Sequence, residues 1–503
     1  MSIPSVLLSG VKNESQDQTI TTDVLEPNVL NSSQAVFVIP KKGSVLDSKS
    51  ALKLKVNWTQ FDATANANVG GKLFSGMLGL IKNARLYASG QLISRLDHAG
   101  EKIHLDNQFK NQEYKEQYCD VKHGSNTGFL VADELANSGL NGAIVNDDIV
   151  STRSAAEPPV VNTPNYMRIV GNVATATDGD NGMEMFLLLE EIFPMLKDLQ
   201  LPVRFLKDEI RIEIDFDTDN TKWLMASPDP HTGVGVAQVT VTEAVMFLDY
   251  ITYNDEVDAE LASTLETTGV SIPFRETAII TTALPGTAGA TVGIRSDVLL
   301  GQEGRAIMKI FVAKRYPNTL SGGLTNNVNS AYSLQGNCRS DALMNQKFNF
   351  VVNDLLIYDR DVENPKESYN YFSYAGEKQA SCYPDAWEYN DTYNTQSVTD
   401  DVLYTTNNGG TADQPILGNG LPTGVVKDGI RGTQNWDSVD LSKYGKQLNP
   451  ANAMRIGSTP IIYRLTRDAG ADVRDQGAVQ LTVFVEYLRL FDLRAGELAV
   501  RDL

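Results

Sequence analysis

Several short segments of the chain alternate apolar and polar residues with a period of two, the pattern of strands that bury one face and expose the other. The clearest is IRIEIDF at Ile210–Phe216, where the isoleucines and Phe216 share one face and charged residues share the other. Residues 51–58 alternate in the same way, and Trp58 on their apolar face is a predicted core residue. Residues 80–93 predict two strands around an Ala-Ser-Gly turn at 88–90. These patterns indicate a fold built mainly from strands.

One segment lacks this alternation and predicts a helix. Residues 183–197 are apolar on all sides until Glu190, Glu191 and Lys197 add polar positions. Pro194 is expected to kink or bound this helix, because proline cannot donate a backbone hydrogen bond inside one.

The strand-rich kind of sequence occurs twice. The first occurrence ends with the long β-rich residues 236–253 and an acidic stretch at 254–260, which we interpret as the close of a first domain. From residue 271 the pattern restarts, with strands predicted near 274–282, 306–313, 348–358 and 460–465 and a long last strand at 478–493. Each half also has one turn-rich stretch, at about 124–182 and 373–436, too long for a simple connection and interpreted as an outer surface loop. The halves predict a tandem duplication of one architecture.

The predicted domain organisation has four parts: an N-terminal arm at 1–33, a first domain at 34–265, a second domain at 266–493, and a C-terminal segment at 494–503. The arm is polar, mixed in charge and without periodicity. We therefore expect it to become ordered only against neighbouring molecules.

Composition supports two folded domains and argues against two classes of partner. The 503 residues suit two sandwiches of about 200 to 250 residues each, and 42% hydrophobic residues can fill two cores. The formal net charge is −20, so direct nucleic-acid binding is not expected. The first residues lack the basic and apolar regions of a signal peptide, and no apolar run approaches the ~20 residues of a membrane span. We expect neither secretion by a signal peptide nor insertion into a bilayer.

Potential metal ligands are few and scattered. Cys119, Cys338 and Cys382 form no CxxC pair, which argues against a disulfide framework and a cysteine zinc site and fits a reducing compartment. The histidines do not have the spacing that places two imidazoles on one helical face. They are His98, His104, His123 and His231.

One acidic segment begins like a calcium-binding loop. Asp215, Asp217 and Asp219 have the spacing of the first ligands of an EF-hand, but Asn220 replaces the required glycine and Ala226 the final glutamate. We interpret the segment as an acidic strand end and turn. The sequence thus predicts no metal site and no cofactor.

Catalytic patterns are also missing. The chain has neither GxSxG nor GxxxxGK[ST], and the glycine-rich residues 286–293 lack the lysine of a phosphate-binding loop, so we interpret them as a hairpin loop. Carboxylate pairs such as Glu190 with Glu191, or Asp359 with Asp361, are expected by chance among 63 acidic residues. No catalytic residue is predicted, and the chain is not expected to be an enzyme.

Trp387 and Trp436 lie in the second turn-rich stretch among Tyr, Asn and Gly residues. They could bind a sugar or a receptor, but we interpret them as packing the long loop onto its domain. A two-sandwich carbohydrate-binding or carbohydrate-active protein remains an alternative that would explain the same β-rich, aromatic-bearing pattern.

Three segments together resemble the double jelly-roll major capsid proteins of virophages, polinton-like viruses, large nucleocytoplasmic DNA viruses and adenovirus-like viruses. Residues 187–216 resemble that family's helix, proline-marked turn and paired inner strand. Residues 244–261 resemble the strand and acidic segment that close the first jelly roll, although Tyr253 and Asn254 replace the usual leucine and acidic residue. Residues 353–371 resemble the second-roll strand that runs into a proline-containing, tyrosine-bearing helix.

The resemblance implies an all-β fold of two tandem eight-stranded jelly rolls with short helices and long surface loops. It implies a major capsid protein whose pseudo-hexameric homotrimers tile an icosahedral virion shell. The implied partners are further copies of the chain with penton and minor capsid proteins, without sequence-specific nucleic-acid binding. The implied location is the virion capsid, assembled inside the host cell. A minor capsid protein of the same lineage stays an alternative, and whether a membrane lies beneath the shell stays open.

Overall fold

The computed structural model describes residues 18–59, 69–73, 76–110, 114, 118, 122–123, 166–169, 182–217, 224–226, 238–286, 293–315, 346–363, 365–375, 436–448, 451–467 and 478–503. Most of the two predicted surface loops therefore lies outside the described residues. The same holds for residues 1–17 and for several residues considered above: Cys119, Cys338, Cys382, His231, Asp219 and Trp387.

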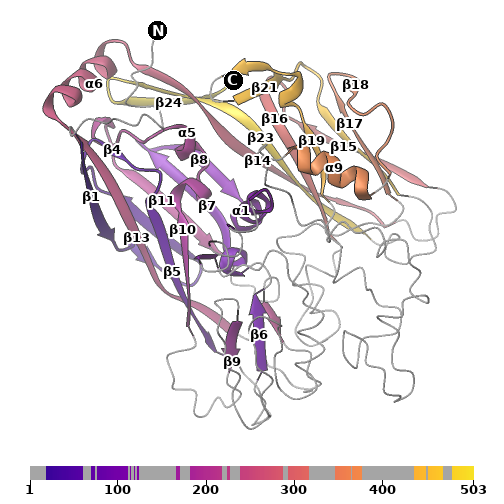
Figure 1. Cartoon of the computed structure of the whole chain (residues 1–503), viewed down its shortest axis with the longest axis horizontal. Helices are drawn as coiled ribbons and strands as arrows, with labels where there is room; N and C mark the ends of the chain where they lie inside the picture. Colours follow the sequence, from indigo (N-terminus) through magenta and orange to yellow (C-terminus); the bar gives the residue numbers. More distant parts are fainter. Residues whose placement is uncertain are drawn as a thin grey trace.

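The first half folds into two facing sheets (Figure 1). One sheet has the order β1 (Gln18–Leu25), β13 (Gln238–Tyr253), β5 (Ala51–Thr59), β10 (Gly182–Leu188), with β4 (Val45–Leu46) beside β13. The other has the order β2 (Val29–Leu30), β3 (Gln34–Ile39), β11 (Ile210–Phe216), β7 (Ile81–Ala88), β8 (Gln91–Asp97). A small third sheet has the order β12 (Leu224–Ala226), β6 (Val69–Leu73), β9 (Tyr166–Ile169).

The alternating segments form the strands that the sequence predicts. On β11 the side chains of Ile210, Ile212 and Ile214 are buried in the core between the two sheets, where they share one cluster with Leu52 and Leu54 of β5. Strands β7 and β8 pair across the predicted turn, where Ser89 and Gly90 adopt positive φ angles of 49° and 74°. Both left-handed residues are what a tight hairpin with right-handed strand twist needs.

The second half forms another pair of sheets. One has the order β14 (Val270–Leu284), β23 (Val479–Arg494), β16 (Ala306–Arg315), β21 (Ala451–Arg455), β20 (Lys446–Leu448), with β19 (Asp437–Asp440) beside β16 and β24 (Glu497–Asp502) beside β23. The other has the order β15 (Ile294–Gly301), β22 (Ile461–Arg467), β17 (Gln346–Val352), β18 (Leu355–Leu356). Helix α9 (Pro365–Ala375) follows, as the resemblance implied for residues 353–371.

Two long strands connect the halves. Figure 1 shows β14 and β23 running beside each other from one sandwich toward the other, and they pair along the whole length of β14. Near one end, Ile272 and Phe274 of β14 and Phe491 of β23 join the core of the first sandwich. Farther along, Val483 and Val485 of β23 join the core of the second. The two cores are therefore held by the same pair of strands.

Short helices complete the described structure. They are α1 (Ala99–Gln108), α4 (Leu189–Ile192), α5 (Met195–Asp198) and α6 (Asp255–Thr267), with 3-10 turns η2 (Gly76–Leu80), η4 (Val203–Phe205) and η8 (Ser442–Tyr444). Helix α6 occupies the acidic stretch that we interpreted only as a domain end. Its start is marked by Asn254, whose side chain accepts a hydrogen bond from the Val257 amide, followed by acidic residues that suit a helix N-terminus.

The helix predicted at residues 183–197 is wrong over its first part. Residues up to Leu188 form β10, which pairs with β5, and only the short α4 and α5 follow, separated at Pro194. A short continuous apolar run fits a buried strand as well as a helix. Here the segment forms a strand because it pairs with the edge of β5.

One further expectation is corrected, and another is tested only in part. The predicted N-terminal arm is wrong for residues 18–33, because β1 pairs residue by residue with β13 and β2 pairs with β3 of the same chain. Most of residues 286–293, interpreted as a hairpin loop, lies outside the described residues, and the strands on either side, β14 and β15, lie in different sheets.

Candidate assembly surfaces and the junction of the two sandwiches

An apolar contact joins helix α1 of the first sandwich to the second. Leu105 of α1 and Phe109, the residue that follows the helix, lie in one buried cluster with Phe311, Phe372, Trp436 and Phe484. The Phe109 ring centroid is 4.8 Å from that of Phe372 and 5.7 Å from that of Phe311. Trp436 stacks on Phe372 with an interplanar angle of 7° and is buried, whereas nearly all of the loop that it was predicted to pack lies outside the described residues.

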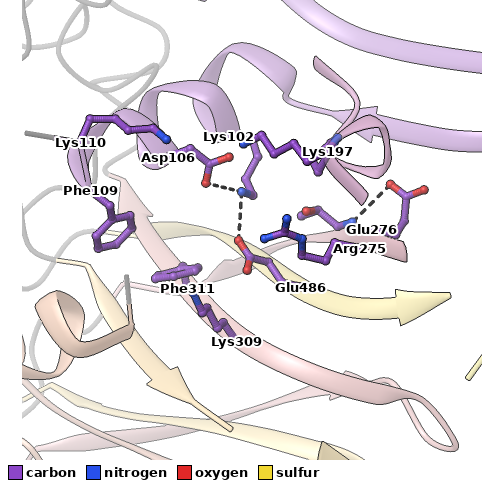
Figure 2. Close-up of a pocket in the computed structure, with 12 residues that line it drawn as sticks. Lys102, Asp106, Phe109, Lys110, Lys197, Arg275, Glu276, Lys309, Phe311 and Glu486 are labelled. Carbon is purple, nitrogen blue, oxygen red and sulfur yellow. Dashed lines mark hydrogen bonds and ion pairs between the residues drawn. The ribbon is translucent and has the colours of Figure 1, made fainter. Parts of the chain in front are cut away.

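A buried lysine lies beside this apolar cluster. Lys102 of α1 is 3% exposed, and its ammonium lies 2.5 Å from the Asp106 carboxylate and 3.0 Å from that of Glu486 on β23 (Figure 2). Burial acts to lower the pKa of Lys102, but the two carboxylates outweigh it and raise that pKa. Burial likewise acts to raise the pKa of Glu486, but Lys102 and Lys309 hold it at about 2. Lys102 is therefore a charged link between the sandwiches.

A second ion pair crosses the junction. The Arg275 guanidinium at β14 donates to Asp198 of α5 over 2.9 Å from Nε and 2.8 Å from an Nη atom. The backbone amide of Arg275 also donates to Asp198, over 3.0 Å. A two-point pair of this kind fixes orientation as well as distance.

The next residue on β14, Glu276, has a buried carboxyl whose pKa is raised, unlike that of Glu486. Glu276 is 3% exposed, accepts a hydrogen bond from Ser94 over 3.1 Å, and lies 3.9 Å from Arg489. Burial raises the pKa of Glu276 to about 8, because the hydrogen bonds and Arg489 compensate only part of the lost hydration. This carboxyl is therefore mostly protonated at neutral pH.

The hairpin between β23 and β24 closes back onto the first sandwich. Ala495 and Gly496 form its turn with positive φ angles of 50° and 76°. The Ala495 amide donates to Leu265 of α6 over 2.9 Å, and the Gly496 carbonyl accepts from the Lys207 amide over 3.2 Å. A Cβ at Gly496 would lie 3.3 Å from the Phe205 carbonyl oxygen, so the left-handed turn and the close approach both favour glycine.

Exposed apolar side chains gather on strands that end a sheet. They are Ile20 and Val24 on β1, Val29 and Leu30 on β2, Leu92 on β8, Ile294 and Leu299 on β15, and Leu355 and Leu356 on β18. Each of these five strands stands at the end of its sheet order and has a free pairing side within the described part of the chain. Edge strands of monomeric proteins usually carry charges that block pairing. Apolar edges on both sandwiches therefore mark candidate contact surfaces.

Of the histidines and carboxylates considered from sequence, His104, His123 and Glu191 make hydrogen-bond contacts at or beside α1. His123 lies 3.2 Å from Asn107 of α1 and 3.3 Å from Glu191, and His104 lies 3.1 Å from Gln108. Burial acts to raise the pKa of Glu191, but hydrogen bonds from His123 and the Leu188 amide outweigh it and lower that pKa. These groups hold α1, α4 and the following chain together.

Two other acidic residues considered from sequence, Asp215 and Asp361, bind different partners and do not form a common site. Asp215 does not act as a turn residue: it lies within β11 and pairs with Arg85 of β7 over 2.6 Å. Asp361 accepts a hydrogen bond from Asn349 over 3.0 Å. Within the described ranges, no group of three or more His, Cys, Asp or Glu side chains is placed to hold a metal ion. Of the helices in this part of the chain, none is long and apolar enough to cross a membrane.

Sequence reasoning missed the junction. Helix α1 (AGEKIHLDNQ) has no apolar face, yet nearly all its residues are buried. Gly100 is the one local signal, since a Cβ there would lie 1.8 Å from the Leu78 carbonyl oxygen, and only glycine permits this approach of α1 to η2. The second carboxylate partner of Lys102, Glu486, and the aromatic residues around Leu105 in the second sandwich leave no trace in the sequence near α1.

Comparison with known structures identifies the fold. A chain of the cryo-EM structure of the Sputnik virophage matches with a TM-score of 0.59 and 11% identity, covering 100% of this chain and 93% of that chain. The Faustovirus major capsid protein matches with a TM-score of 0.53 and 10% identity, covering 96% and 92%. A PBCV-1 virus capsid structure matches with a TM-score of 0.52 and 10% identity, covering 97% and 98%. No protein-family model and no curated protein sequence matches the chain.

The class of fold follows from these matches. The chain has the double jelly-roll fold of viral major capsid proteins, as its three sequence segments predicted. With identities near 10%, the shared feature is the fold.

Proposed function

We propose that this chain is a viral major capsid protein that self-assembles as pseudo-hexameric homotrimers, which tile an icosahedral shell. The observation that carries the proposal is the set of apolar side chains on the edge strands β1, β2, β8, β15 and β18. A second copy would bury this surface and supply the missing strand or side-chain contacts.

The geometry supports a trimer for a physical reason. Two similar sandwiches, linked by shared strands and by the Lys102 and Arg275 ion pairs, make one two-lobed unit. Three such units around a three-fold axis give six lobes, a nearly hexagonal outline that packs edge to edge. The proposed role is structural rather than enzymatic, and the proposed location is the virion capsid. Penton and minor capsid proteins are the proposed further partners.

The oligomeric state tests the proposal. Mass photometry of the purified chain at several salt concentrations should show a species of three times the 55.0 kDa monomer. Negative-stain electron microscopy of that species should show six lobes around a three-fold axis. A monomer as the sole species under all conditions would contradict the proposal.

A further inference from the structure

The core of the second jelly roll encloses a lysine and an aspartate whose amino and carboxyl groups are in contact. Lys314 of β16 and Asp437 of β19 are both fully buried, and Nζ of Lys314 donates to Oδ1 of Asp437 over 2.6 Å. The two strands are neighbours in one sheet, with Val312 opposite Asp437. Because residues two apart on a strand share a face, Lys314 and Asp437 both point toward the core that contains Val312.

A tyrosine from the facing sheet contacts the same carboxyl group. Tyr463 of β22 is fully buried, and its hydroxyl donates to Oδ2 of Asp437 over 2.5 Å. Burial raises the pKa of Tyr463 well above its ordinary value, and the neighbouring Asp437 adds to the shift. The phenol therefore keeps its proton and acts as a donor. Aromatic rings lie beside these groups: Nζ of Lys314 is 6.0 Å from the Phe348 ring centroid, and the ring centroids of Phe350 and Tyr463 are 5.3 Å apart.

This pair is enclosed more completely than the lysine at the junction of the two jelly rolls. Around Lys102, the carboxylates of Asp106 and Glu486 are 29% and 16% exposed, so water still hydrates that ion pair in part. Lys314 and Asp437 are each 0% exposed. Charged groups are costly to hold away from water, and moving one proton from the ammonium to the carboxylate leaves two neutral groups instead.

The carboxyl group of Asp437 shows the effect of this enclosure. Burial is the largest influence on its pKa and raises it, although Lys314 and Tyr463 both act to lower it. A neutral amine is a nucleophile and a protonated carboxyl group accepts its attack, whereas an ammonium and a carboxylate do not react. Burial therefore favours the two forms that can react with each other, and the fold holds them in contact.

We propose that Lys314 and Asp437 condense within the folded chain to form an isopeptide bond between β16 and β19. Nζ attacks Cγ of Asp437, and the new C–N bond replaces the bond from Cγ to Oδ1. Two protons of the Lys314 ammonium pass to Oδ1, which is hydrogen-bonded to Nζ and leaves as water. Oδ2 remains as the amide oxygen, and the Tyr463 hydroxyl stabilises the negative charge that develops on it during the attack. The reaction needs no oxidant, cofactor or second protein.

The same enclosure favours the product of the reaction. In water, hydration of the charged forms stabilises an amine and a carboxylic acid against condensation, but the core supplies no such hydration and the amide is neutral. The bond closes a covalent ring over 123 positions of the chain, and such a ring restricts the unfolded state. The inference does not rest on a capsid role, because it concerns cohesion within one chain.

Mass spectrometry of the intact, denatured full-length chain tests the proposal. The measured mass of the wild type should be lower than the mass of its sequence by that of one water molecule. Trypsin should then release a branched peptide in which residues 310–315 are joined to residues 432–443, since trypsin does not cleave after a cross-linked Lys314. This peptide locates the bond and distinguishes it from a loss of water elsewhere in the chain.

Two lysine variants form a matched pair. Lys314→Arg keeps a cation beside Asp437, but a guanidinium stays protonated and cannot attack, so this variant should have the full mass of its sequence. Lys102→Arg makes the same change at the buried lysine of the junction and should keep the loss of one water. Tyr463→Phe removes the donor to Oδ2 and should form the bond at least about a hundredfold more slowly, measured from the fraction of lower-mass chains at successive times after cell-free synthesis.

Three results would overturn the proposal: a wild type that is folded by circular dichroism and has the full mass, a lower mass that persists in Lys314→Arg, or a digest without the branched peptide. If Lys314→Arg does not fold, the mass of the wild type and the branched peptide still decide. An unaltered rate in Tyr463→Phe would overturn the role given to the tyrosine.

Discussion

Lys102 of α1 and Glu486 of β23 lie 3.0 Å apart and form an ion pair between the two jelly rolls. We predict that Lys102→Met destabilises the protein by roughly 3–5 kcal/mol, because it leaves two carboxylates without their enclosed cation. The value should fall toward the lower limit, since Lys309 and Arg275 still act on Glu486. Urea unfolding measures the change.

Lys207→Met is the matched control for this prediction. Lys207 pairs with Glu497 across side chains that are 65% and 78% exposed, and such a pair contributes about 0–1 kcal/mol. Equal effects of the two substitutions would show that the enclosure of Lys102 has no energetic role.

The buried carboxyl of Glu276 predicts a loss of stability at rising pH. Its pKa is about 8 in the folded chain against 4.5 for the ordinary group. A raised folded pKa means that the unfolded state releases the proton first as pH rises. The protein should therefore lose stability from about pH 4.5 until pH passes 8, by an amount on the order of a few kcal/mol.

Glu276→Gln tests this, because glutamine keeps the hydrogen bonds and cannot ionise. The variant should be increasingly more stable than wild type as pH rises from 5 to 8, measured by urea unfolding at fixed ionic strength. Glu486→Gln gives the opposite sign: the pKa of Glu486 is about 2, so its contribution exists above pH 4.5 and disappears as pH falls toward 2. Parallel pH profiles of both variants would contradict the assignment.

The edge strands predict substitutions that affect assembly without affecting the fold. Val24→Lys on β1 and Leu355→Lys on β18 replace side chains that are 64% and 69% exposed. The unfolding free energy of the monomer should change by no more than about 0.5 kcal/mol. Self-association should weaken strongly, because a lysine on an edge strand blocks apolar contact and strand pairing. Sedimentation velocity against wild type measures this, and unaltered assembly in both variants would exclude these edges as contacts.

A core substitution should give the contrary pattern. Ile212 is fully buried on β11, so Ile212→Asp places a carboxylate without a partner between the two sheets. We predict a loss above about 4 kcal/mol and no folded chain to assemble. Arg211→Gln, on the outward face of the same strand, should leave both circular dichroism and assembly close to wild type.

The alternation of apolar and polar residues correctly predicted strands that bury one face and expose the other. Ile210–Phe216 and the hairpin at Ser89 and Gly90 fold as the sequence indicates, because one buried face and a turn with positive φ are local requirements. The run from Met183 to Leu188 fits both a helix and a strand, and its pairing with β5 decided the matter. Strand β1 was not predicted, because its order comes from pairing with β13, which lies far along the chain.

The junction between the two jelly rolls could not be predicted either, because its contacts also join residues that lie far apart in the sequence. Lys102, Glu276 and Glu486 each look like ordinary surface residues in sequence, and their burial depends on how two halves meet. The double jelly-roll fold could be predicted from the sequence because three segments of the chain resemble characteristic segments of that family. The candidate contact surfaces needed the structure, since exposure on an edge strand is visible only after strand order is known.

The hairpin between β23 and β24 is among the last parts of the described chain to be synthesised, and the first jelly roll depends on it. Leu265 and Lys207 find their partners Ala495 and Gly496 only after almost all of the described chain has left the ribosome. Until then the core of the first jelly roll lacks Phe491, Leu493 and Leu498, and Lys102 of α1 lacks its partner Glu486 on β23. Nascent chains halted before β23 should therefore depend on chaperones, because the core of the first jelly roll is still incomplete at that point.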